Sequence, residues 1–460
     1  MFRPTDLTQL SCAVALVATT LTLSACGSGG EGAGDIAGHD NDDGSDVFSQ
    51  PLARRPTPQS CEIEDLNNWV YRSMQDYYLF YEQVQKNVRT ADYASPEELI
   101  RELRVEPDTF SYVADETAYS AFFDEGETFG YGWNFARTAD DKLLFSLIEP
   151  NSPLALAGVE RSEELVAING ITLENYRRLS ATERAEIIGE GEQIKTIELT
   201  IGNANMANRV VEVTKATYSL QTVLDTRVFE QNGVDVGYLN FYQFVDTSSE
   251  ELNQAFAEFQ DAAISELVID LRFNGGGRIS VAKEMASHIL GQNYRDDVFT
   301  TFAYNDKYAT RNVSLYFQDM QSKLTLNRVF VLQSSNTCSA SELVVNSLRP
   351  FMEVLTIGST SCGKPYATSP SVACGKVTNA LEIQLLNAAG LGDYFDGIAA
   401  DCPVSEDVTQ PLGETTEPLL AAALDYINTG SCALTARQSA RTGHELTDEF
   451  KQSWQGGNSF

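Results

Sequence analysis

The most informative stretch of this sequence is NTCSASELVVNSLRPFMEVLTIGSTSCGK, residues 336–364. An apolar run at 328–332 precedes it and predicts a buried strand. A polar turn follows at 333–338. Apolar residues then recur at helical spacing, at Ala340, Leu343, Val344 and Leu348. The pattern therefore predicts a strand, a tight turn and a helix, with Ser339 at the turn.

Ser339 and Lys364 are the two residues of this stretch that favour chemistry. A serine at the start of a helix lies beside free backbone N–H groups, which can meet a developing oxyanion. A second apolar run at 354–358 leads into a glycine-containing turn that carries Lys364. The arrangement predicts a serine nucleophile and a lysine base on neighbouring loops. SASE is also a capping-box pattern, so Ser339 equally fits a helix N-cap.

A lysine can act as the base only when it is neutral, and its ordinary pKa is about 10.4. Burial disfavours the charged form and lowers that pKa. The sequence neighbours of Lys364 are Cys362, Gly363, Pro365 and Tyr366, and none of them is a carboxylate. We expect an apolar setting that lowers the pKa of Lys364.

The surrounding chain alternates strands and helices between residues 216 and 432. Apolar patterns predict strands at 236–241, 266–271 and 380–386, and helices at 248–264, 279–290 and 417–426. Such alternation is typical of a layered α/β core.

The composition and charge of the chain limit the kinds of site and partner that it can have. The 460 residues carry a net charge of −33, and 43% are hydrophobic, which allows two or three domains. The acidic balance argues against nucleic-acid partners. The chain has three histidines, of which only His288 lies in an apolar stretch, and its flanks predict a structural helix. The chain therefore lacks the histidines that a Ser–His–Asp triad or a metal site would need. We expect no cofactor and no metal.

Residues 1–26 are predicted to be a secretory signal, with an apolar stretch too short to span a membrane. The end, LSAC, resembles the bacterial lipoprotein signal. That resemblance implies acylation of Cys26 and a lipid anchor at the periplasmic face of the outer membrane in a Gram-negative cell. An ordinary cleaved signal is the alternative. Residues 27–58, rich in Gly, Asp and Ser, predict a flexible linker.

Residues 59–115 predict an N-terminal helical segment with an aromatic cluster in its core. Ser95 and Pro96 favour a helix start, with serine at the N-cap and proline at the first helical position. Residues 433–460 are polar and predict a loose tail.

Residues 116–215 resemble a PDZ domain. The resemblance rests on FGYGW at 129–133, IEPNSPLALAGV at 148–159 and LVAING at 165–170. It implies a peptide-binding loop whose backbone N–H groups hold a C-terminal carboxylate, formed by Phe129, Gly130, Tyr131 and Gly132. A PDZ fold kept only as a spacer is the alternative.

With those segments in order, the chain resembles the C-terminal processing (tail-specific) serine peptidases, which use a Ser–Lys dyad and carry a PDZ domain. Three motifs carry the resemblance: IDLRFNGGG at 269–277, CSASE at 338–342, and the Gly-Lys pair that ends at Lys364, 25 residues after Ser339. It implies an α/β, ClpP/crotonase-like core with a PDZ-like domain, and polypeptide substrates.

The same resemblance implies residue roles. Ser339 is the nucleophile and Lys364 the general base, and the oxyanion hole combines the backbone N–H of Ala340 with that of Gly276 or Gly277, Gly276 being favoured. Many members carry Gln where this chain has Thr368, and some carry Asp where it has Pro350. The residue that orients Lys364 is therefore left open.

Six cysteines remain after the signal, and an even number in an exported protein implies disulfides. Their pairing stays open. Cys362 with Cys374 is one short-range option, and Cys338 as a free buried thiol is another.

Two other functions compete. One is a catalytically silent lipoprotein that binds peptides on the same folds. The other is an α/β-hydrolase esterase, which the chain disfavours because it lacks Gly-x-Ser-x-Gly and a placed histidine.

Overall fold

A computed structural model of the chain describes residues 55–203, 206–432 and 445–447. These residues belong to one compact unit. Among them, no helix combines the length and the apolar character that crossing a membrane requires. The predicted signal with Cys26, most of the predicted linker and nearly all of the predicted tail lie outside the described residues.

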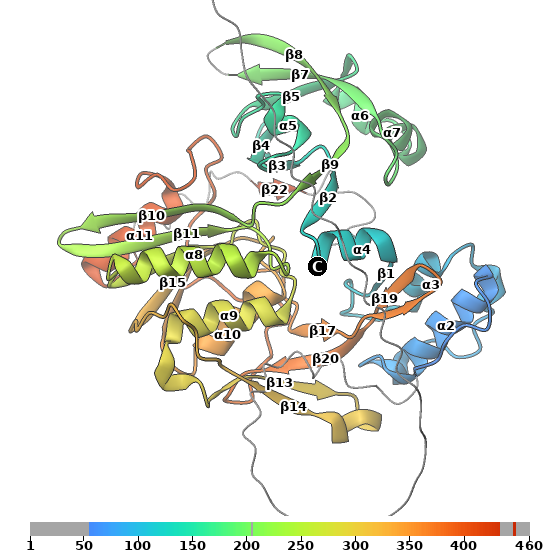
Figure 1. Ribbon diagram of the computed structural model, residues 1–460. Helices are drawn as coiled ribbons and strands as arrows, with labels where there is room; N and C mark the ends of the chain where they lie inside the picture. Colours follow the sequence, from blue (N-terminus) through green and yellow to red (C-terminus); the bar gives the residue numbers. More distant parts are fainter. Residues whose placement is uncertain (1–54, 204–205, 433–444, 448–460) are drawn as a thin grey trace, which may run out of the picture. The chain divides into compact units, whose positions relative to one another are not determined.

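A six-stranded sheet forms the centre of the α/β core (Figure 1). In spatial order its strands are β10 (Val223–Gln231), β11 (Val234–Phe241), β12 (Glu266–Asp270), β15 (Arg328–Gln333), β16 (Glu353–Gly358) and β21 (Cys402–Pro403). β10 pairs with β11 antiparallel, and the other neighbours pair in parallel. The fold is therefore the mixed α/β core that the sequence predicts.

Helices cover both faces of this sheet, which is why its strands are continuously apolar. Val329 and Val331 of β15 pack with the helices α8 (Ser248–Asp261), α9 (Ile279–Leu290) and α10 (Ala340–Leu348). Phe330 and Leu332, the alternate residues, pack with α11 (Pro418–Thr429). The predicted elements are all present, but some ends differ: α8 ends three residues before the predicted Ile264, α11 continues three residues past the predicted Tyr426, and β11 starts two residues earlier than predicted.

Two smaller antiparallel sheets lie beside the core and carry residues of the site. One contains β14 (Val313–Tyr316), β13 (Val298–Tyr304), β20 (Leu381–Leu386) and β17 (Tyr366–Thr368). The other contains β1 (Tyr112–Asp115), β19 (Lys376–Asn379) and β18 (Ser371–Ala373). Only Ala380 separates β19 from β20, so the chain passes directly from one sheet to the other.

The N-terminal helical segment contains α2 (Ile63–Asp76), α3 (Pro96–Leu103) and the short 3-10 helices η1 (Tyr81–Gln83) and η2 (Thr90–Asp92). Ser95 caps α3, because its hydroxyl accepts the N–H of Glu98, as predicted. The apolar residues of the segment form one cluster with Tyr366 and Leu381. The segment therefore packs on the strands that follow Lys364.

A seven-stranded antiparallel sheet has a hydrophobic cluster of its own between Tyr131 and Val213. Its strands are β3 (Trp133–Arg137), β4 (Leu143–Ile148), β5 (Glu164–Ile168), β6 (Ile171–Thr172), β7 (Thr196–Asn203), β8 (Met206–Thr214) and β22 (Glu445–Thr447). Three short helices accompany it: α5 (Pro153–Leu156), α6 (Leu173–Arg177) and α7 (Ala181–Ile188). This sheet occupies most of the range in which the sequence resembles a PDZ domain.

A two-stranded ribbon joins that sheet to the core. It pairs β2 (Glu127–Gly130) with β9 (Ala216–Ser219), and α4 (Glu116–Phe123) precedes it. Residues of α4 pack with Val245 of the core rather than with the seven-stranded sheet. The remaining 3-10 helices are η3 (Gln292–Tyr294) and η4 (Asp306–Arg311).

Three disulfides cross-link the described residues: Cys61–Cys374, Cys338–Cys362 and Cys402–Cys432. The short-range pairing of Cys362 with Cys374 is therefore wrong, and so is a free thiol at Cys338. Cys374 instead ties β19 and its turn to the start of the N-terminal segment. Sequence distance misled the expectation because the fold brings remote cysteines together.

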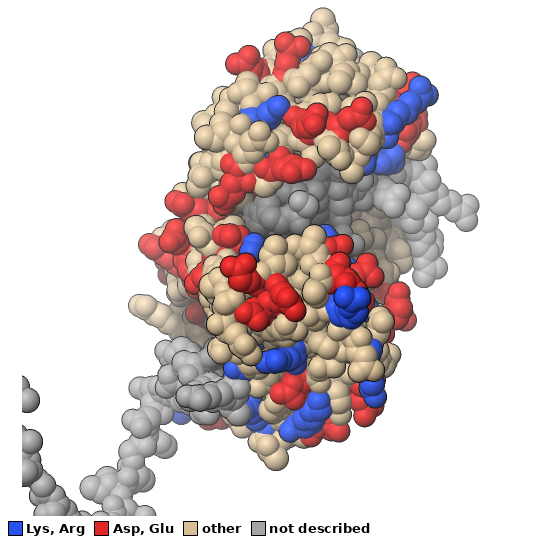
Figure 2. Space-filling view, turned by 90° about the vertical axis from the view of Figure 1, so that its right-hand side faces the viewer, with Lys and Arg blue, Asp and Glu red and all other residues tan. Residues whose placement is uncertain are grey.

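The many acidic residues of the sequence are visible on the surface of the protein. Figure 2 shows Asp and Glu side chains spread over the face that it presents, with Lys and Arg interspersed among them. Elsewhere in the described residues, opposite charges also pair in partly buried positions, as in Arg328 with Glu266 at 2.7 Å.

Candidate active site

Ser339 lies between β15 and α10, as the sequence predicts, but in an unusual backbone conformation. Its φ is +53° and its ψ is −111°, whereas an ordinary N-cap residue is extended. A non-glycine residue held in such a region costs on the order of 1–3 kcal/mol, and such residues cluster at functional sites. The residue is 8% exposed. Ser339 and Glu342 also form the predicted capping box, so the cap is confirmed, while the unusual backbone conformation is a feature that a plain cap does not need.

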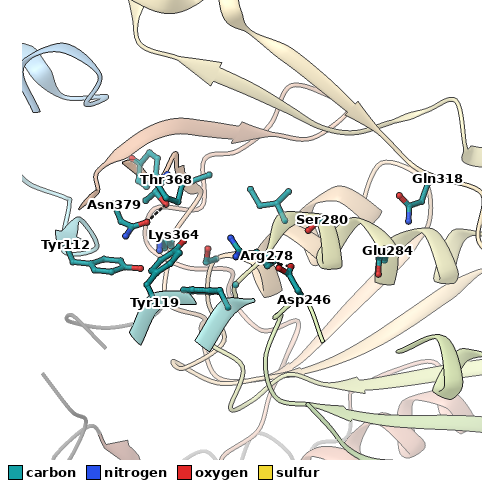
Figure 3. Close-up of a pocket in the computed structure, with 17 residues that line it drawn as sticks. Tyr112, Tyr119, Asp246, Arg278, Ser280, Glu284, Gln318, Lys364, Thr368 and Asn379 are labelled. Carbon is teal, nitrogen blue, oxygen red and sulfur yellow. Dashed lines mark hydrogen bonds and ion pairs between the residues drawn. The ribbon is translucent and has the colours of Figure 1, made fainter. Parts of the chain in front are cut away.

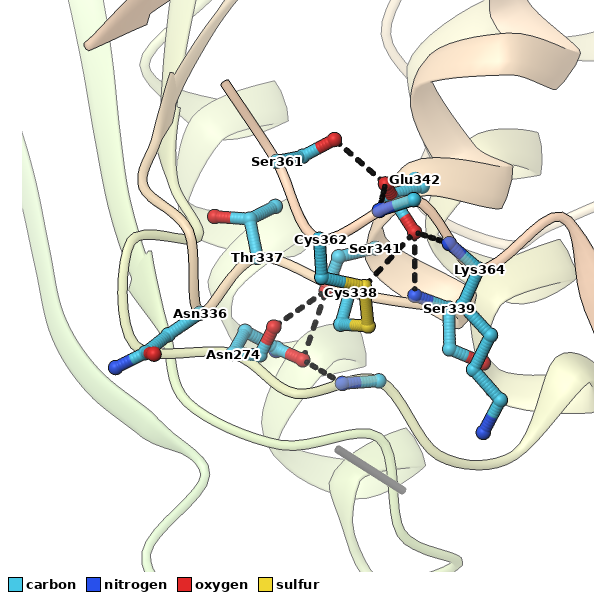
Figure 4. The surroundings of a disulfide bond; sticks show 12 residues. Asn274, Asn336, Thr337, Cys338, Ser339, Ser341, Glu342, Ser361, Cys362 and Lys364 are labelled. Carbon is cyan, nitrogen blue, oxygen red and sulfur yellow. Dashed lines mark hydrogen bonds between the residues drawn. A yellow bond between two sulfur atoms is a disulfide. The ribbon is translucent and has the colours of Figure 1, made fainter. Parts of the chain in front are cut away.

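Glu342 ties the Ser339 turn to the Lys364 loop (Figure 4). Its carboxylate accepts the backbone N–H of Ser339 and of Lys364, both at 2.9 Å, and that of Gly363 at 2.8 Å. The Ser361 hydroxyl donates to it at 2.5 Å. Burial raises the pKa of Glu342, and these four donors oppose that rise. One buried carboxylate therefore sets the spacing of the two loops.

The Cys338–Cys362 disulfide is a second link between the same loops (Figure 4). It joins the residue before Ser339 to the residue two before Lys364. Both sulfurs lie beside Glu342, so three potential metal-ligand atoms are close together. A sulfur bonded in a disulfide has no thiolate to offer, so this trio acts as a brace rather than as a metal site.

Lys364 is 4% exposed, and its Nζ lies 5.3 Å from the centre of the Phe110 ring. Burial lowers the pKa of Lys364 to about 8, although the carboxylates of Asp108 and Glu342 favour its charged form. The expected apolar setting without a carboxylate is therefore only half right. Both carboxylates are remote from Lys364 in sequence, and Asp108 comes from the N-terminal segment.

Asp108 is itself buried and held in place. Its Oδ1 accepts the N–H of Phe110 and of Ser111, and its Oδ2 accepts the hydroxyl of Tyr78 at 2.7 Å. These bonds fix the turn that presents Phe110 to Lys364. Sequence reasoning missed both residues, since only packing brings this turn to the lysine loop.

Ser339 and Lys364 line one pocket of about 600 Å³ (Figure 3). Gly277 and Arg278 also line it, and so does Tyr119 of α4. Arg278 forms an ion pair with Asp124 and another with Asp246 at 3.4 Å. The pocket is thus built from the core, the N-terminal segment and α4 together.

The glycine turn after β12 distinguishes between the two predicted oxyanion donors. The N–H of Gly276 already donates to Asn274 Oδ1 at 2.8 Å. Among the described residues, neither the N–H of Gly277 nor that of Ala340 donates a hydrogen bond. A Cβ at residue 277 would lie 1.9 Å from the Phe244 carbonyl oxygen, so this position requires glycine. The geometry favours Gly277 over Gly276.

Buried ion pairs hold the start of the glycine turn. Arg272 is fully buried and contacts Asp270 at 2.8 Å, and Glu406 and Glu417 each at 2.7 Å. A buried charge is tolerated only with such partners. Asn274 continues the bracing, because its backbone oxygen accepts the N–H of Cys338, the residue before Ser339.

The other residues singled out in the sequence lie elsewhere or have structural partners. The ring of His288 stacks on Phe256 at 4.5 Å, its Nδ1 contacts the Ser322 carbonyl, and it does not line the pocket. Pro350 is exposed at the end of α10. Thr368 lines the pocket, and its hydroxyl donates to Asn379 Oδ1 at 3.2 Å.

The predicted peptide-binding loop lies outside this pocket. Phe129 and Gly130 end β2, and Gly132 precedes β3. Tyr131 is buried, with its hydroxyl on the carbonyls of Ile188 and Lys195. The structure brings the four residues together, separate from Ser339 and Lys364.

Comparisons with known proteins agree on one family. A family model described as "Peptidase family S41" matches residues 235–389, and "Peptidase S41 N-terminal domain" matches residues 65–112. The first range contains Ser339 and Lys364. The second contains Asp108 and Phe110.

Among curated relatives, a carboxyl-terminal-processing protease of Picosynechococcus is 28% identical over 225 residues, which cover 49% of this chain and 51% of the relative. The carboxy-terminal processing protease CtpB of Bacillus subtilis is 24% identical over 226 residues, which cover 49% and 44%. The chain thus spans about half the length of these relatives.

Among solved structures, a putative S41 protease from Bacteroides fragilis superposes with a TM-score of 0.63 at 25% identity. The match covers 79% of this chain and 97% of that one. It extends the likeness beyond the segments that the family models match.

Proposed function

The chain belongs to peptidase family S41, and from this premise we propose that it is a serine endopeptidase that uses Ser339 as nucleophile and Lys364 as general base. One observation carries the proposal: Ser339, in a strained turn at a helix start, shares a pocket with a lysine whose pKa burial lowers to about 8.

In the proposed reaction, the neutral Lys364 amine takes the proton of the Ser339 hydroxyl while Oγ attacks the scissile carbonyl carbon. Negative charge then develops on the carbonyl oxygen. The backbone N–H groups of Ala340 and Gly277, which have no partner among the described residues, are placed to donate to it. The Lys364 ammonium returns its proton to the leaving amine, which releases the first product.

The second half of the reaction hydrolyses the ester on Ser339. Lys364, neutral again, takes a proton from water, and the hydroxide equivalent attacks the acyl carbon. The same two N–H groups stabilise the second oxyanion. The ester bond then breaks, Ser339 regains its proton from Lys364, and the new carboxylate leaves.

We assign cleavage near exposed C-termini to this enzyme, with the seven-stranded sheet as a PDZ-like peptide-binding domain. The sequence resemblance at 129–133 and the separate core of the sheet support this assignment. Phe129 and Gly130 lie in the ribbon that leads directly to the core. A peptide held by this loop would therefore be tethered to the same chain that carries the pocket.

For location, we propose an exported, lipid-anchored protein at the periplasmic face of the outer membrane. The lipobox-like end at Cys26 supports the anchor. The three disulfides support an oxidising compartment, since such bonds are rare in the cytosol.

A fluorophosphonate probe and casein hydrolysis test the function together. The probe should label Ser339, and Ser339→Ala and Lys364→Ala should each lose casein hydrolysis while remaining folded by circular dichroism. Ser347→Ala is the matched control, because Ser347 is also buried in α10 but does not line the pocket. A Ser339→Ala protein as active as the wild type would overturn the proposal. A folded wild type that neither reacts nor hydrolyses would favour the silent peptide-binding lipoprotein.

A further inference from the structure

Asn379 has a buried side-chain amide that has no role in the reaction proposed above. It is 1% exposed, ends β19, and lines the same pocket as Ser339 and Lys364. Its Nδ2 is buried and has no hydrogen-bond partner among the described residues. A buried polar atom without a partner is costly, so its presence beside a candidate active site calls for a role.

Two neighbouring strands place Asn379 close to Lys364. β1 pairs Tyr112 with Asn379, and Phe110, just before β1, contacts Nζ of Lys364. On the other side, Thr368 of β17, the strand that follows Lys364, bonds the amide. Figure 3 shows Asn379, Thr368 and Lys364 at one end of the pocket, with Glu284 and Gln318 at the other.

The amide can face the pocket with either of its polar atoms. The oxygen and nitrogen of a carboxamide have nearly the same shape, so rotation by 180° exchanges them without changing the packing. As drawn, Oδ1 accepts the Thr368 hydroxyl and Nδ2 is left over. After the exchange, Nδ2 donates to the Thr368 oxygen and Oδ1 is left to accept a hydrogen bond from the pocket.

A lysine base needs such an acceptor. Its neutral amine has two N–H donors and one lone pair, and the lone pair must point at the Ser339 hydroxyl to take the proton. An acceptor that binds one N–H restricts the rotation of the amine and holds the lone pair in that direction. Thr368, four residues after the lysine, forms its hydrogen bond with the amide of Asn379 and so can hold that amide in place.

We propose that Asn379 is a positioning residue for Lys364, with its carboxamide oxygen accepting an N–H of the amine and Thr368 holding the amide in place. The proposal rests on the proposed function. It answers the open question of what orients the lysine, since this chain has Thr368 and Pro350 at the two positions considered from sequence.

The test measures kcat and KM of Asn379→Ala and Asn379→Asp on a fluorogenic peptide between pH 6 and 10. For Asn379→Ala we expect kcat to fall on the order of 100-fold with KM nearly unchanged, because misdirected groups lose rate rather than binding. Asp keeps an acceptor oxygen, so Asn379→Asp should recover activity above pH 8. Its added carboxylate joins those of Asp108 and Glu342 in favouring the ammonium, so the activity rise should move to higher pH.

Asn67→Ala is the matched control. Asn67 is a fully buried amide of α2 that bonds the carbonyls of Thr90 and Tyr93 outside the pocket. It should lower the melting temperature without changing kcat or the pH profile. If Ser339→Ala is inactive but Asn379→Ala keeps wild-type kcat, the inference fails and the proposed function stands. If Ser339→Ala keeps wild-type activity, the proposed function itself fails. A loss in Asn379→Ala that Asn379→Asp does not restore at any pH would also overturn the positioning role.

Discussion

The amine of Lys364 lies over the ring of Phe110, with 5.3 Å between Nζ and the ring centre. The two residues come from separate parts of the chain: the turn before β1 and the loop after β16. The N-terminal segment therefore forms part of the wall that excludes water from the candidate base.

The pH dependence of hydrolysis should follow Lys364. Burial lowers the pKa of Lys364 to about 8, so the amine is protonated below that pH and neutral above it. Only the neutral form takes the Ser339 proton, and we expect kcat/KM to rise as the pH passes through about 8. A rate profile from pH 5 to 10 on a peptide substrate measures this. A flat profile would contradict lysine as the base.

Replacement of Phe110 by Ala should move that rise to higher pH. The ring attracts the ammonium, which favours the charged form, but it also keeps water away, which disfavours it. Burial is the largest influence on the pKa of Lys364, so losing the ring should raise that pKa. Phe110→Leu keeps the burial and should shift the profile less than Phe110→Ala. A shift to lower pH in Phe110→Ala would show that the ring acts mainly by attraction.

Lys364→Met should be more stable than the wild type at neutral pH. The pKa of Lys364 is lower in the folded than in the unfolded chain, so below pH 8 folding retains an ammonium in a site that disfavours it. The penalty is roughly 3 kcal/mol and disappears as the pH rises from 8 past the ordinary lysine value. Urea unfolding at pH 6.5 and pH 10.5 measures it. Exposed Lys86→Met is the control, and an equal gain there would contradict the interpretation.

The Cys338–Cys362 disulfide beside the proposed nucleophile should affect the rate of hydrolysis as well as the stability of the fold. In the double variant Cys338→Ala/Cys362→Ala, we expect kcat to fall at least about tenfold, because the loops that carry Ser339 and Lys364 lose a covalent link. Cys402→Ala/Cys432→Ala removes a disulfide that joins β21 to the chain that follows α11. It should cost about 2–4 kcal/mol of unfolding free energy with kcat unchanged. Equal rates for both double variants would contradict the brace.

Glu342→Gln should impair both folding and rate. Two oxygens accept four donors in the wild type, whereas the Gln amide nitrogen would face N–H groups with no lone pair to offer. We expect a loss of about 2–4 kcal/mol in unfolding free energy, with a lower kcat in the protein that remains folded. Asn346→Asp, a change of similar size later in α10, serves as the control for kcat. Wild-type kcat in Glu342→Gln would show that the carboxylate does not set the loop spacing.

Local sequence patterns predict the core well because they depend on interactions between residues that are close together in the sequence. The apolar run at 328–332 and the helical spacing after Ser339 state which faces are buried, and β15 and α10 follow them. The helix at 248–264 was predicted too long, since Ala263 adopts a positive φ after α8 ends and starts the turn into β12. Boundaries depend on such single turns, which periodicity does not report.

Local sequence patterns predict the order of strands and helices, the turn that carries Ser339, and the loop that carries Lys364. Long-range packing, in contrast, sets the cysteine pairing, the contacts of Glu342 with two loops, the hydrogen bond that occupies the N–H of Gly276, and the positions of Asp108 and Phe110 near the lysine, with Asn379 lining the same pocket. The two groups of features differ in how far apart along the sequence the interacting residues lie. Burial periodicity and helix starts depend on residues within one turn of each other, whereas the pKa and direction of an amine depend on every group that packing brings to it.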